Sequence, residues 1–263
     1  MLAFLRKNFR SACTRLQAFE CIFRRSLQHQ AAGFRGDLPT FAALNKPLTD
    51  RAELELALEE CRRLGLPLHC DLQKNWDTLT AVTLALRSCP ERTEAVLDAG
   101  ATMYSAFLKV LYLYGFRDLT AVNLEFKTPR RLGPIRYLPG DITRLGFSES
   151  QFAFVFCQSV IEHGVSVESY FREMARIVRP GGMLLTSTDY WEPKISTSGA
   201  KAYGTDVRIF CAAEMREMLE LALQYGWKPI SNPMYECDES VVRWQRLRLD
   251  FTFYNLALQK TRE

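Results

Sequence analysis

The chain has 263 residues, 48% of them hydrophobic and 24% charged, and this size and composition fit one large α/β domain with an appendage, or two small domains. Eight cysteines without a CxxC pair and three histidines without an HExxH motif argue against a disulfide framework and a dedicated metal site, and indicate a reducing compartment such as the cytoplasm. Residues 1–35 carry a net charge of +6, whereas the whole chain carries +4. The remaining residues therefore carry about −2 and do not form a basic nucleic-acid binder.

Residues 2–28 have a helical period, with apolar side chains on one face and arginines mostly on the opposite one. Such a basic amphipathic helix has three interpretations. It packs on the core or on a second subunit, it lies on an anionic membrane surface, or it is an organellar targeting peptide. No apolar run approaches the ~20 residues that a membrane-spanning helix needs. The sequence therefore predicts at most peripheral membrane contact, and it does not define the oligomeric state.

A loop rich in glycine and proline leads to a second predicted helix, residues 50–64. Asp50 and Glu53 have the spacing of a capping box at the start of this helix, and Gly65 ends it. A further helix is predicted over residues 76–88, directly before the first strand.

From Ala95 onwards, apolar segments of strand length alternate with helical segments. The predicted strands are residues 95–100, 119–126, 135–141, 152–158, 182–190, 229–237 and 249–260, and the predicted helices between them are residues 105–115, 167–178 and 212–226. This alternation predicts an α/β fold, with a seven-stranded, mostly parallel sheet and helices on both faces. Ligands of such folds bind at the carboxyl ends of the strands, near the switch point after the first strand. We assign residues 1–70 to an N-terminal helical extension and residues 71–263 to the α/β domain.

The loop after the first predicted strand bears on the class of cofactor. The pyrophosphate of NAD would need a GxGxxG loop, but Thr102 and Ser105 occupy the second and third glycine positions, and Asp98 adds a negative charge. Side chains at positions that require a positive φ cost roughly 1–2 kcal/mol each. S-adenosylmethionine has no phosphate, so it does not require the glycine-rich loop that a pyrophosphate needs. Its cationic part also suits a neighbouring acid. From this loop alone, a cofactor site and a plain strand–helix turn remain equally open.

The stretch from Gly140 to Trp191 carries a more specific pattern. Its parts are, in order, Gly140-Asp141, a loop with Phe147, the apolar strand 152–156, Val160 to His163, a helix with Glu173 and Arg176, and Arg179 to Gly182. Over about residues 95–191 this combination closely resembles the class I S-adenosylmethionine-dependent methyltransferases that act on small molecules. The resemblance implies a Rossmann-like fold, S-adenosylmethionine as the cofactor and S-adenosylhomocysteine as its product.

The resemblance also implies roles for single positions at the strand ends. The implied cofactor-binding residues are Asp98, Gly100, Ala101, Asn123, Glu125, Asp141, Ile142, Cys157, Gln158 and Ser159. Asp98 and Gly100 match the motif that borders the methionyl end of the cofactor, and Asp141 matches the acid that accepts from the adenine amino group. The family usually has an acid for the two ribose hydroxyls where this chain has Asn123, with Glu125 two residues later on the same strand face. The last three residues of the set lie beside the expected position of the transferred methyl group.

Methyl transfer to a hydroxyl benefits from a base, and the candidate catalytic residues are His163, Asp189 and Tyr190. Histidine titrates near neutrality and is the natural base, although a helix-start or packing role for His163 and a strand-end role for the other two stay open. The polar segment 192–210 stands where related enzymes have substrate-covering loops. This favours a polar small molecule as acceptor, such as a sugar, another hydroxylated metabolite or a lipid-linked glycan, and a mobile surface loop is the alternative.

Two classes of function follow from these observations. The first is an enzyme, a methyltransferase that acts on a small-molecule acceptor and not on nucleic acid, since the chain has no Asn-Pro-Pro-Tyr motif. The second is a binding or scaffold protein that keeps the fold without turnover, which the incomplete glycine loop favours. A dehydrogenase is a distant third because the loop suits NAD poorly.

Overall fold

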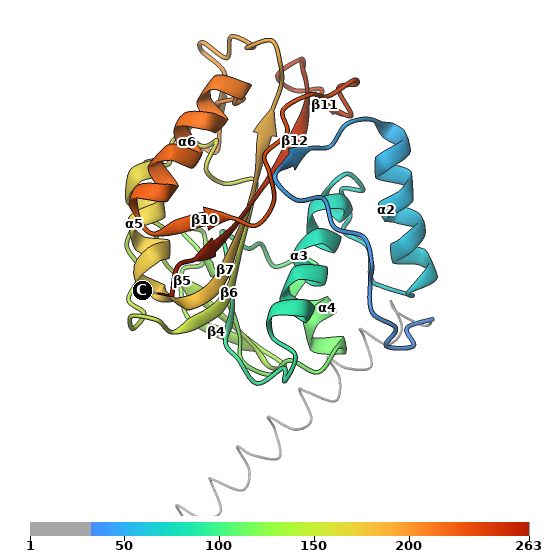
Figure 1. Cartoon of the computed structure of the whole chain (residues 1–263), viewed down its shortest axis with the longest axis vertical. Helices are drawn as coiled ribbons and strands as arrows, with labels where there is room; N and C mark the ends of the chain where they lie inside the picture. The colour runs from blue at the N-terminus through green and yellow to red at the C-terminus, as the bar shows by residue number, and fades with distance from the viewer. Residues whose placement is uncertain (1–32, 263) are drawn as a thin grey trace, which may run out of the picture.

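The structure is a computed structural model that describes residues 33–262. The predicted amphipathic helix over residues 2–28 lies outside these described residues. A central sheet divides the described chain, and helices cover both of its faces (Figure 1).

The central sheet has the predicted, mostly parallel arrangement. Five parallel strands stand in the order β5 (Ile135–Pro139), β3 (Leu119–Asn123), β2 (Val96–Ala99), β6 (Phe152–Gln158) and β7 (Val178–Tyr190). The long β12 (Leu249–Lys260) pairs antiparallel with β7 and with β10 (Trp227–Pro229). The short strands β1 (Lys46–Pro47), β4 (Arg130–Leu132) and β11 (Val242–Trp244) complete a ten-stranded sheet. The strand order reverses at β2, which lies between β3 and β6, so the expected ligand edge is at the carboxyl end of β2.

Two layers of helices bury the two faces of the sheet. The helices α2 (Arg51–Arg63), α3 (Lys74–Ser88) and α4 (Phe107–Leu113) lie on one face, and α5 (Val167–Ile177) and α6 (Ala212–Gln224) lie on the other (Figure 1). Strand β6 shows why both layers are needed, since its side chains alternate between the faces. Phe154 and Phe156 belong to the core under α3 and α4, whereas Val155 and Cys157 belong to the core under α5 and α6.

Several element boundaries differ from the sequence-based prediction. Strand β3 ends at Asn123 rather than at residue 126. Of the strand predicted over residues 229–237, only Pro229 lies in β10, which begins two residues earlier, at Trp227. The stretch from Arg179 to Gly182, predicted to separate helix from strand, lies inside β7. It is accommodated by an irregularity, because the register with β6 shifts at this point and the extra residues bulge out of the ladder.

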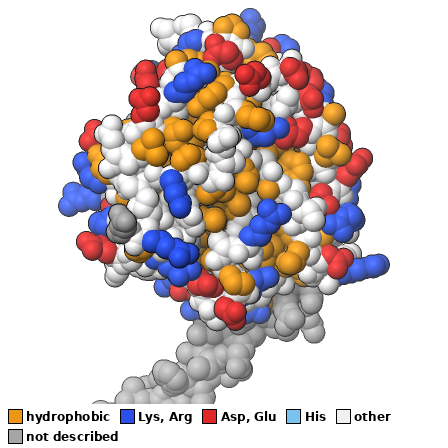
Figure 2. All heavy atoms as spheres, in the orientation of Figure 1, with side chains coloured by type: hydrophobic (Ala, Val, Ile, Leu, Met, Phe, Trp, Pro, Cys, Tyr) orange, Lys and Arg blue, Asp and Glu red, His pale blue; other side chains and the backbone are white. Residues whose placement is uncertain are grey.

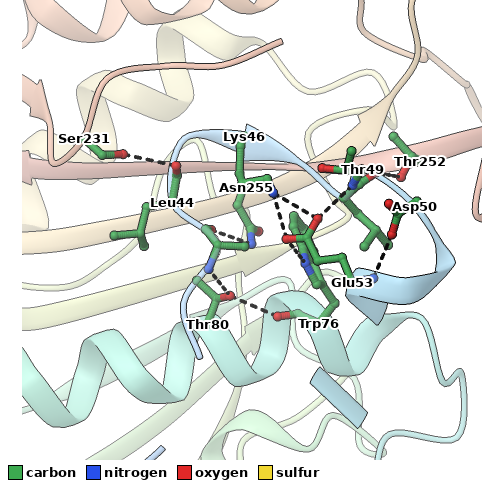
Figure 3. A network of polar contacts seen from close by, with 12 residues as sticks. Leu44, Lys46, Thr49, Asp50, Glu53, Trp76, Thr80, Ser231, Thr252 and Asn255 are labelled. Atoms are coloured by element: carbon green, nitrogen blue, oxygen red, sulfur yellow. Dashed lines mark hydrogen bonds and ion pairs between the residues drawn. The ribbon is translucent and has the colours of Figure 1, made fainter. Parts of the chain in front are cut away.

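Residues near the start of the described chain are bound to the sheet through Glu53 (Figure 3). Its carboxylate accepts hydrogen bonds from Lys46 Nζ (3.0 Å), from the backbone N–H of Thr49 (3.0 Å) and from Trp76 Nε1 (3.1 Å). The predicted capping box is half present: Asp50 accepts from the Glu53 N–H, but the Glu53 carboxylate bonds to Thr49 rather than back to Asp50. Glu53 thus joins β1, α2 and α3 into one unit.

The surface carries charges of both signs. On the face shown in Figure 2, basic and acidic side chains alternate around apolar side chains that gather near the middle. None of the helices within residues 33–262 is long and apolar enough to cross a membrane. Two short strands, β8 (Lys201–Ala202) and β9 (Thr205–Asp206), form a separate hairpin in the predicted substrate-covering segment.

Candidate functional site

Asp98 lies at the carboxyl end of β2, at the switch point of the sheet. Its side chain is buried, with 3% of the residue exposed. Burial disfavours the charged carboxylate and raises its pKa to about 7, against a smaller opposite effect of the Lys109 ammonium. The site therefore holds a buried acid whose ionised form a nearby positive charge would stabilise.

Gly100 is the next element of the site, and two observations require a glycine there. Its φ is +94°, a conformation that side chains rarely adopt, and a Cβ atom would stand 2.3 Å from Val160 Cγ2. Val160 belongs to the loop that follows β6. The loops after β2 and after β6 are therefore packed directly on each other at this edge of the sheet.

The remainder of the loop after β2 holds its shape without further glycines. Thr102 donates its backbone N–H to Ser105 Oγ (3.0 Å), and Lys109 Nζ donates to the Met103 carbonyl (3.1 Å). None of residues 101–106 has a positive φ. The positions that hold side chains in place of glycines therefore carry no positive-φ strain, because side-chain hydrogen bonds close the turn in ordinary backbone conformations.

Asn123, at the end of β3, is turned towards this loop. Its Nδ2 donates to the carbonyls of Gly100 (3.1 Å) and Ala101 (3.0 Å), and its Oδ1 accepts from the backbone N–H of Glu125 (2.8 Å). Glu125 is exposed in the turn after the strand and does not share a strand face with Asn123, because β3 ends at residue 123. Both ends of the Asn123 amide are engaged by the protein itself.

Asp141 and Ile142 follow β5, the strand beside β3. Asp141 is exposed, and its Oδ1 accepts from the backbone N–H (2.9 Å) and the Oγ1 (2.7 Å) of Thr143. Ile142 is buried among apolar side chains. Gly140 leaves no room for a side chain, since a Cβ would stand 2.8 Å from Val122 Cγ1. An oriented carboxylate thus stands beside an apolar residue at the edge of the sheet.

The three predicted residues at the end of β6 point in different directions. Cys157 is buried against Tyr170 in the core under α5 and α6, and burial raises the pKa of its thiol. Gln158 Nε2 donates to the Lys74 carbonyl (3.0 Å) and to Asp77 Oδ1 (2.5 Å). Ser159 has a φ of +50°, and its hydroxyl accepts from Lys74 Nζ. Only Ser159 and Gln158 face the side of the sheet covered by α3.

Sequence reasoning missed the first turn of α3, which lies over the ends of β6 and β7. Lys74 Nζ stands 3.8 Å from the centre of the Phe253 ring and also donates a hydrogen bond to Ser159 Oγ. Asp77 is fully buried, accepts from Ser187 Oγ (2.5 Å), and has its pKa raised by burial to about 6. Two charged side chains in the first turn of a helix whose one other charged residue is Arg87, in its last turn, were the available signal.

Asp189 and Tyr190 end β7 on opposite faces of the sheet. Burial, and next the charge of Glu162, raise the pKa of Asp189 well above its usual range and so disfavour its carboxylate form. Glu162 Oε2 accepts from Thr188 Oγ1 (3.1 Å), while Glu162 Oε1 is buried without a hydrogen-bond partner among the described residues. Tyr190 OH donates to the Tyr235 carbonyl (2.6 Å). Neither Asp189 nor Tyr190 presents a free base.

His163, in the loop after β6, is placed differently. Burial lowers the pKa of its imidazole, which is therefore neutral at physiological pH, and its Nδ1 is buried without a partner among the described residues. The rings of Tyr203 (5.2 Å between centres) and Trp244 (6.3 Å) stand edge-on to it. Tyr203 lies between β8 and β9, so segment 192–210 places one aromatic ring against His163. Of the three candidate bases, His163 alone has an imidazole that is neutral at physiological pH and lies against Tyr203 of segment 192–210.

A cavity of about 490 Å³ lies at the opposite edge of the sheet, near the amino ends of β2, β3 and β5. It is lined by Arg92, Arg117, Arg131 and Arg136, together with the acids Glu91 and Asp118. All four arginines have partners within the protein: Arg92, Arg117 and Arg131 donate to backbone carbonyls, and Arg136 pairs with Asp118 (2.7 Å). This cavity is remote from the strand ends that carry the predicted residues.

Comparisons with known proteins agree with this layout. Residues 97–186 match the family model described as a methyltransferase domain. No curated protein matches the chain. Among solved structures, the 1,6-didemethyltoxoflavin-N1-methyltransferase of Burkholderia thailandensis, with its substrate and S-adenosylhomocysteine bound, is 20% identical, with 85% of this chain and 94% of that chain covered and a TM-score of 0.50.

Two further structures have the same fold. The [4+2]-cyclase SpnF is 14% identical over 86% of this chain and 99% of that chain, with a TM-score of 0.52. Phosphoethanolamine N-methyltransferase 2 of Haemonchus contortus is 15% identical over 70% of this chain, with a TM-score of 0.50, and the chain spans 52% of that protein's length. The fold and the resemblance drawn from residues 95–191 are thereby confirmed.

Proposed function

Starting from a class I methyltransferase fold with a methyltransferase domain over residues 97–186, we propose that this chain transfers a methyl group from S-adenosylmethionine to a hydroxyl of a small polar molecule. The observation that carries the proposal is the set of groups at the carboxyl edge of the parallel strands: buried Asp98, the ordered loop after β2, oriented Asp141 and neutral His163. A scaffold without turnover is not favoured, because side-chain hydrogen bonds close the loop after β2 and none of residues 101–106 has a positive φ.

The residues at this edge fit the proposed cofactor. Asp98 is a buried acid whose ionised form a cationic group would stabilise, and S-adenosylmethionine carries a sulfonium and an ammonium group. Asp141 would accept from the adenine amino group, with Ile142 against the ring, and exposed Glu125 would receive ribose hydroxyls. Gly100 and Ala101 would border the methionyl part. When bound, the cofactor supplies the electrophilic methyl group.

The chain's own contribution is to orient the acceptor and remove its proton. The neutral imidazole of His163 would take the proton from the acceptor hydroxyl as the oxygen attacks, and Tyr203 and Trp244 would exclude water around it. Burial and the charge of Glu162 disfavour the carboxylate form of Asp189, so Asp189 is not offered as the base. Ser159 and Lys74 supply hydrogen-bond donors to a polar acceptor such as a sugar or another hydroxylated metabolite.

Titration calorimetry of the full chain with S-adenosylmethionine and S-adenosylhomocysteine tests the cofactor proposal. We expect micromolar binding to the wild type and weaker binding to two variants, Asp141→Ala and Asp141→Asn. The second variant keeps the oxygen that accepts from Thr143, so it separates loss of the turn from loss of the carboxylate. Asp206→Asn, with a side chain 80% exposed, is the surface control. A folded wild type that binds neither ligand would refute the proposal.

We further propose peripheral membrane contact through residues 2–28, which rests on the sequence alone. In co-sedimentation with vesicles containing anionic lipid, the full chain should pellet to a greater extent than residues 36–263. Equal behaviour of the two proteins would refute this role and favour one of the other two interpretations of that segment.

A further inference from the structure

Asn123 replaces an acid at the position where the resemblance implies a ribose-binding carboxylate. We propose that Asn123 is instead a positioning residue that holds the loop after β2 in its binding conformation, so that restoring an acid there weakens cofactor binding. This inference rests on the proposed function, because it concerns the same cofactor site.

The hydrogen bonds of Asn123 define which atom of its amide points to the loop. The two partners at 3.0–3.1 Å are the carbonyl oxygens of Gly100 and Ala101, which only accept, and the partner at 2.8 Å is the Glu125 N–H, which only donates. Nδ2 must therefore face the loop. A carboxylate has no donor, so an aspartate at this position would set an anionic oxygen against two carbonyl oxygens.

The loop depends on the hydrogen bonds from Asn123 because few other hydrogen bonds hold it in place. Only Gly100 has the backbone freedom of a glycine, and the Thr102–Ser105 and Met103–Lys109 bonds close the far part of the loop. The carbonyls of residues 100 and 101 form the near part, which would border the methionyl end of the ligand. In this chain an amide on the neighbouring strand fixes where this part of the backbone lies.

If Asn123 contacts the ribose, its replacement should affect a different set of ligands than if it contacts the loop. S-adenosylhomocysteine and adenosine carry the same ribose and adenine, but adenosine has no amino-acid part. We expect Asn123→Asp to weaken S-adenosylhomocysteine binding at least tenfold in titration calorimetry while adenosine affinity stays within twofold of the wild type. Hydrogen exchange of the backbone amides over residues 100–105 should be faster in this variant. Asn232→Asp, at an exposed asparagine, is the matched charge control.

Each other result overturns the inference. An Asn123→Asp protein that binds S-adenosylhomocysteine as tightly as the wild type, or more tightly, would assign Asn123 to the ribose, and equal weakening of both ligands would do the same. If the variant does not fold, Asn123→Ala takes its place: it removes the two bonds to the loop without adding a charge, so it should weaken S-adenosylhomocysteine binding several-fold and spare adenosine, and an unchanged affinity would overturn the inference. A wild type without any binding refutes the proposed function instead, and the exchange measurement then still tests the loop contact.

Discussion

Replacing the buried Asp98 by asparagine should make the stability of the ligand-free protein less sensitive to pH. The carboxyl has an ordinary pKa of 3.8 in the unfolded chain and about 7 in the folded protein. A pKa raised by folding means that its contribution to stability is fully present below pH 3.8 and is lost as the pH rises towards 7. Asparagine does not titrate, so the variant lacks this loss.

The size of the effect follows from the two pKa values. Between pH 5 and pH 7.5 the Asp98 carboxyl alone should lower the free energy of unfolding by about 2.5 kcal/mol, at 1.36 kcal/mol per pKa unit. The asparagine amide brings its own cost for two buried N–H donors, roughly 1–3 kcal/mol, but this cost does not depend on pH. The difference between variant and wild type should therefore change with pH by about this amount.

Urea unfolding at pH 5, 6.5 and 7.5 measures this difference directly. Asp77 and other buried acids shift both proteins alike, so the comparison isolates position 98. Asp206→Asn, at an exposed acid, should follow the wild type at every pH. The same pH dependence in Asp98→Asn and in the wild type would show that Asp98 is not a desolvated acid, and the electrostatic argument for a cationic ligand would fail. We also expect this variant to bind S-adenosylmethionine more weakly.

Three further predictions concern the loops and the N-terminal attachment. Gly100→Ala should lower the free energy of unfolding by roughly 2–5 kcal/mol, since positive-φ strain adds to the overlap with Val160, and a loss below 1 kcal/mol in urea unfolding would contradict the close approach. The imidazole of His163 should titrate below the ~6.5 of a free histidine in an NMR titration, and a midpoint above that value would exclude it as a neutral base. Glu53→Ala should cost about 2–4 kcal/mol because it leaves Trp76 Nε1 and the Thr49 N–H without their acceptor, whereas Glu59→Ala, on the exposed side of α2, should change stability by less than ~0.5 kcal/mol.

The sequence predicted the order of elements well because the alternation of apolar strands and amphipathic helices is a local signal. Strands β6 and β12 have the predicted bounds, and α5 ends one residue before the predicted end. The errors arise where pairing between distant segments decides. Whether residues 230–237 extend a strand depends on whether β12 is long enough to pair with them. Whether β7 continues through Gly182 depends on a bulge in its pairing with β6.

The candidate site was predictable by position and less so by orientation. The strand ends were identified, but no local pattern tells that Asn123 turns to its neighbouring loop, or that Cys157 and Tyr190 face the α5 and α6 side. Lys74 and Asp77 join the site because α3 lies across the ends of β6 and β7, a contact between segments more than 80 residues apart along the chain. Such contacts depend on the packed fold rather than on neighbouring residues.

Strand β12 also constrains how the protein is made. It pairs with β7 along eight residues, with β10 and β11, and with β1, whose Lys46 stands opposite Asn255. Residues 249–260 are synthesised after all of these partners, so the backbone N–H and C=O groups along one edge of β7 stay unpaired while more than 50 residues are added. The nascent chain is then prone to pair with other chains, and closing the sheet requires a contact across about 200 residues, which slows folding. Chaperone binding during synthesis should therefore begin when β7 emerges and end when β12 docks.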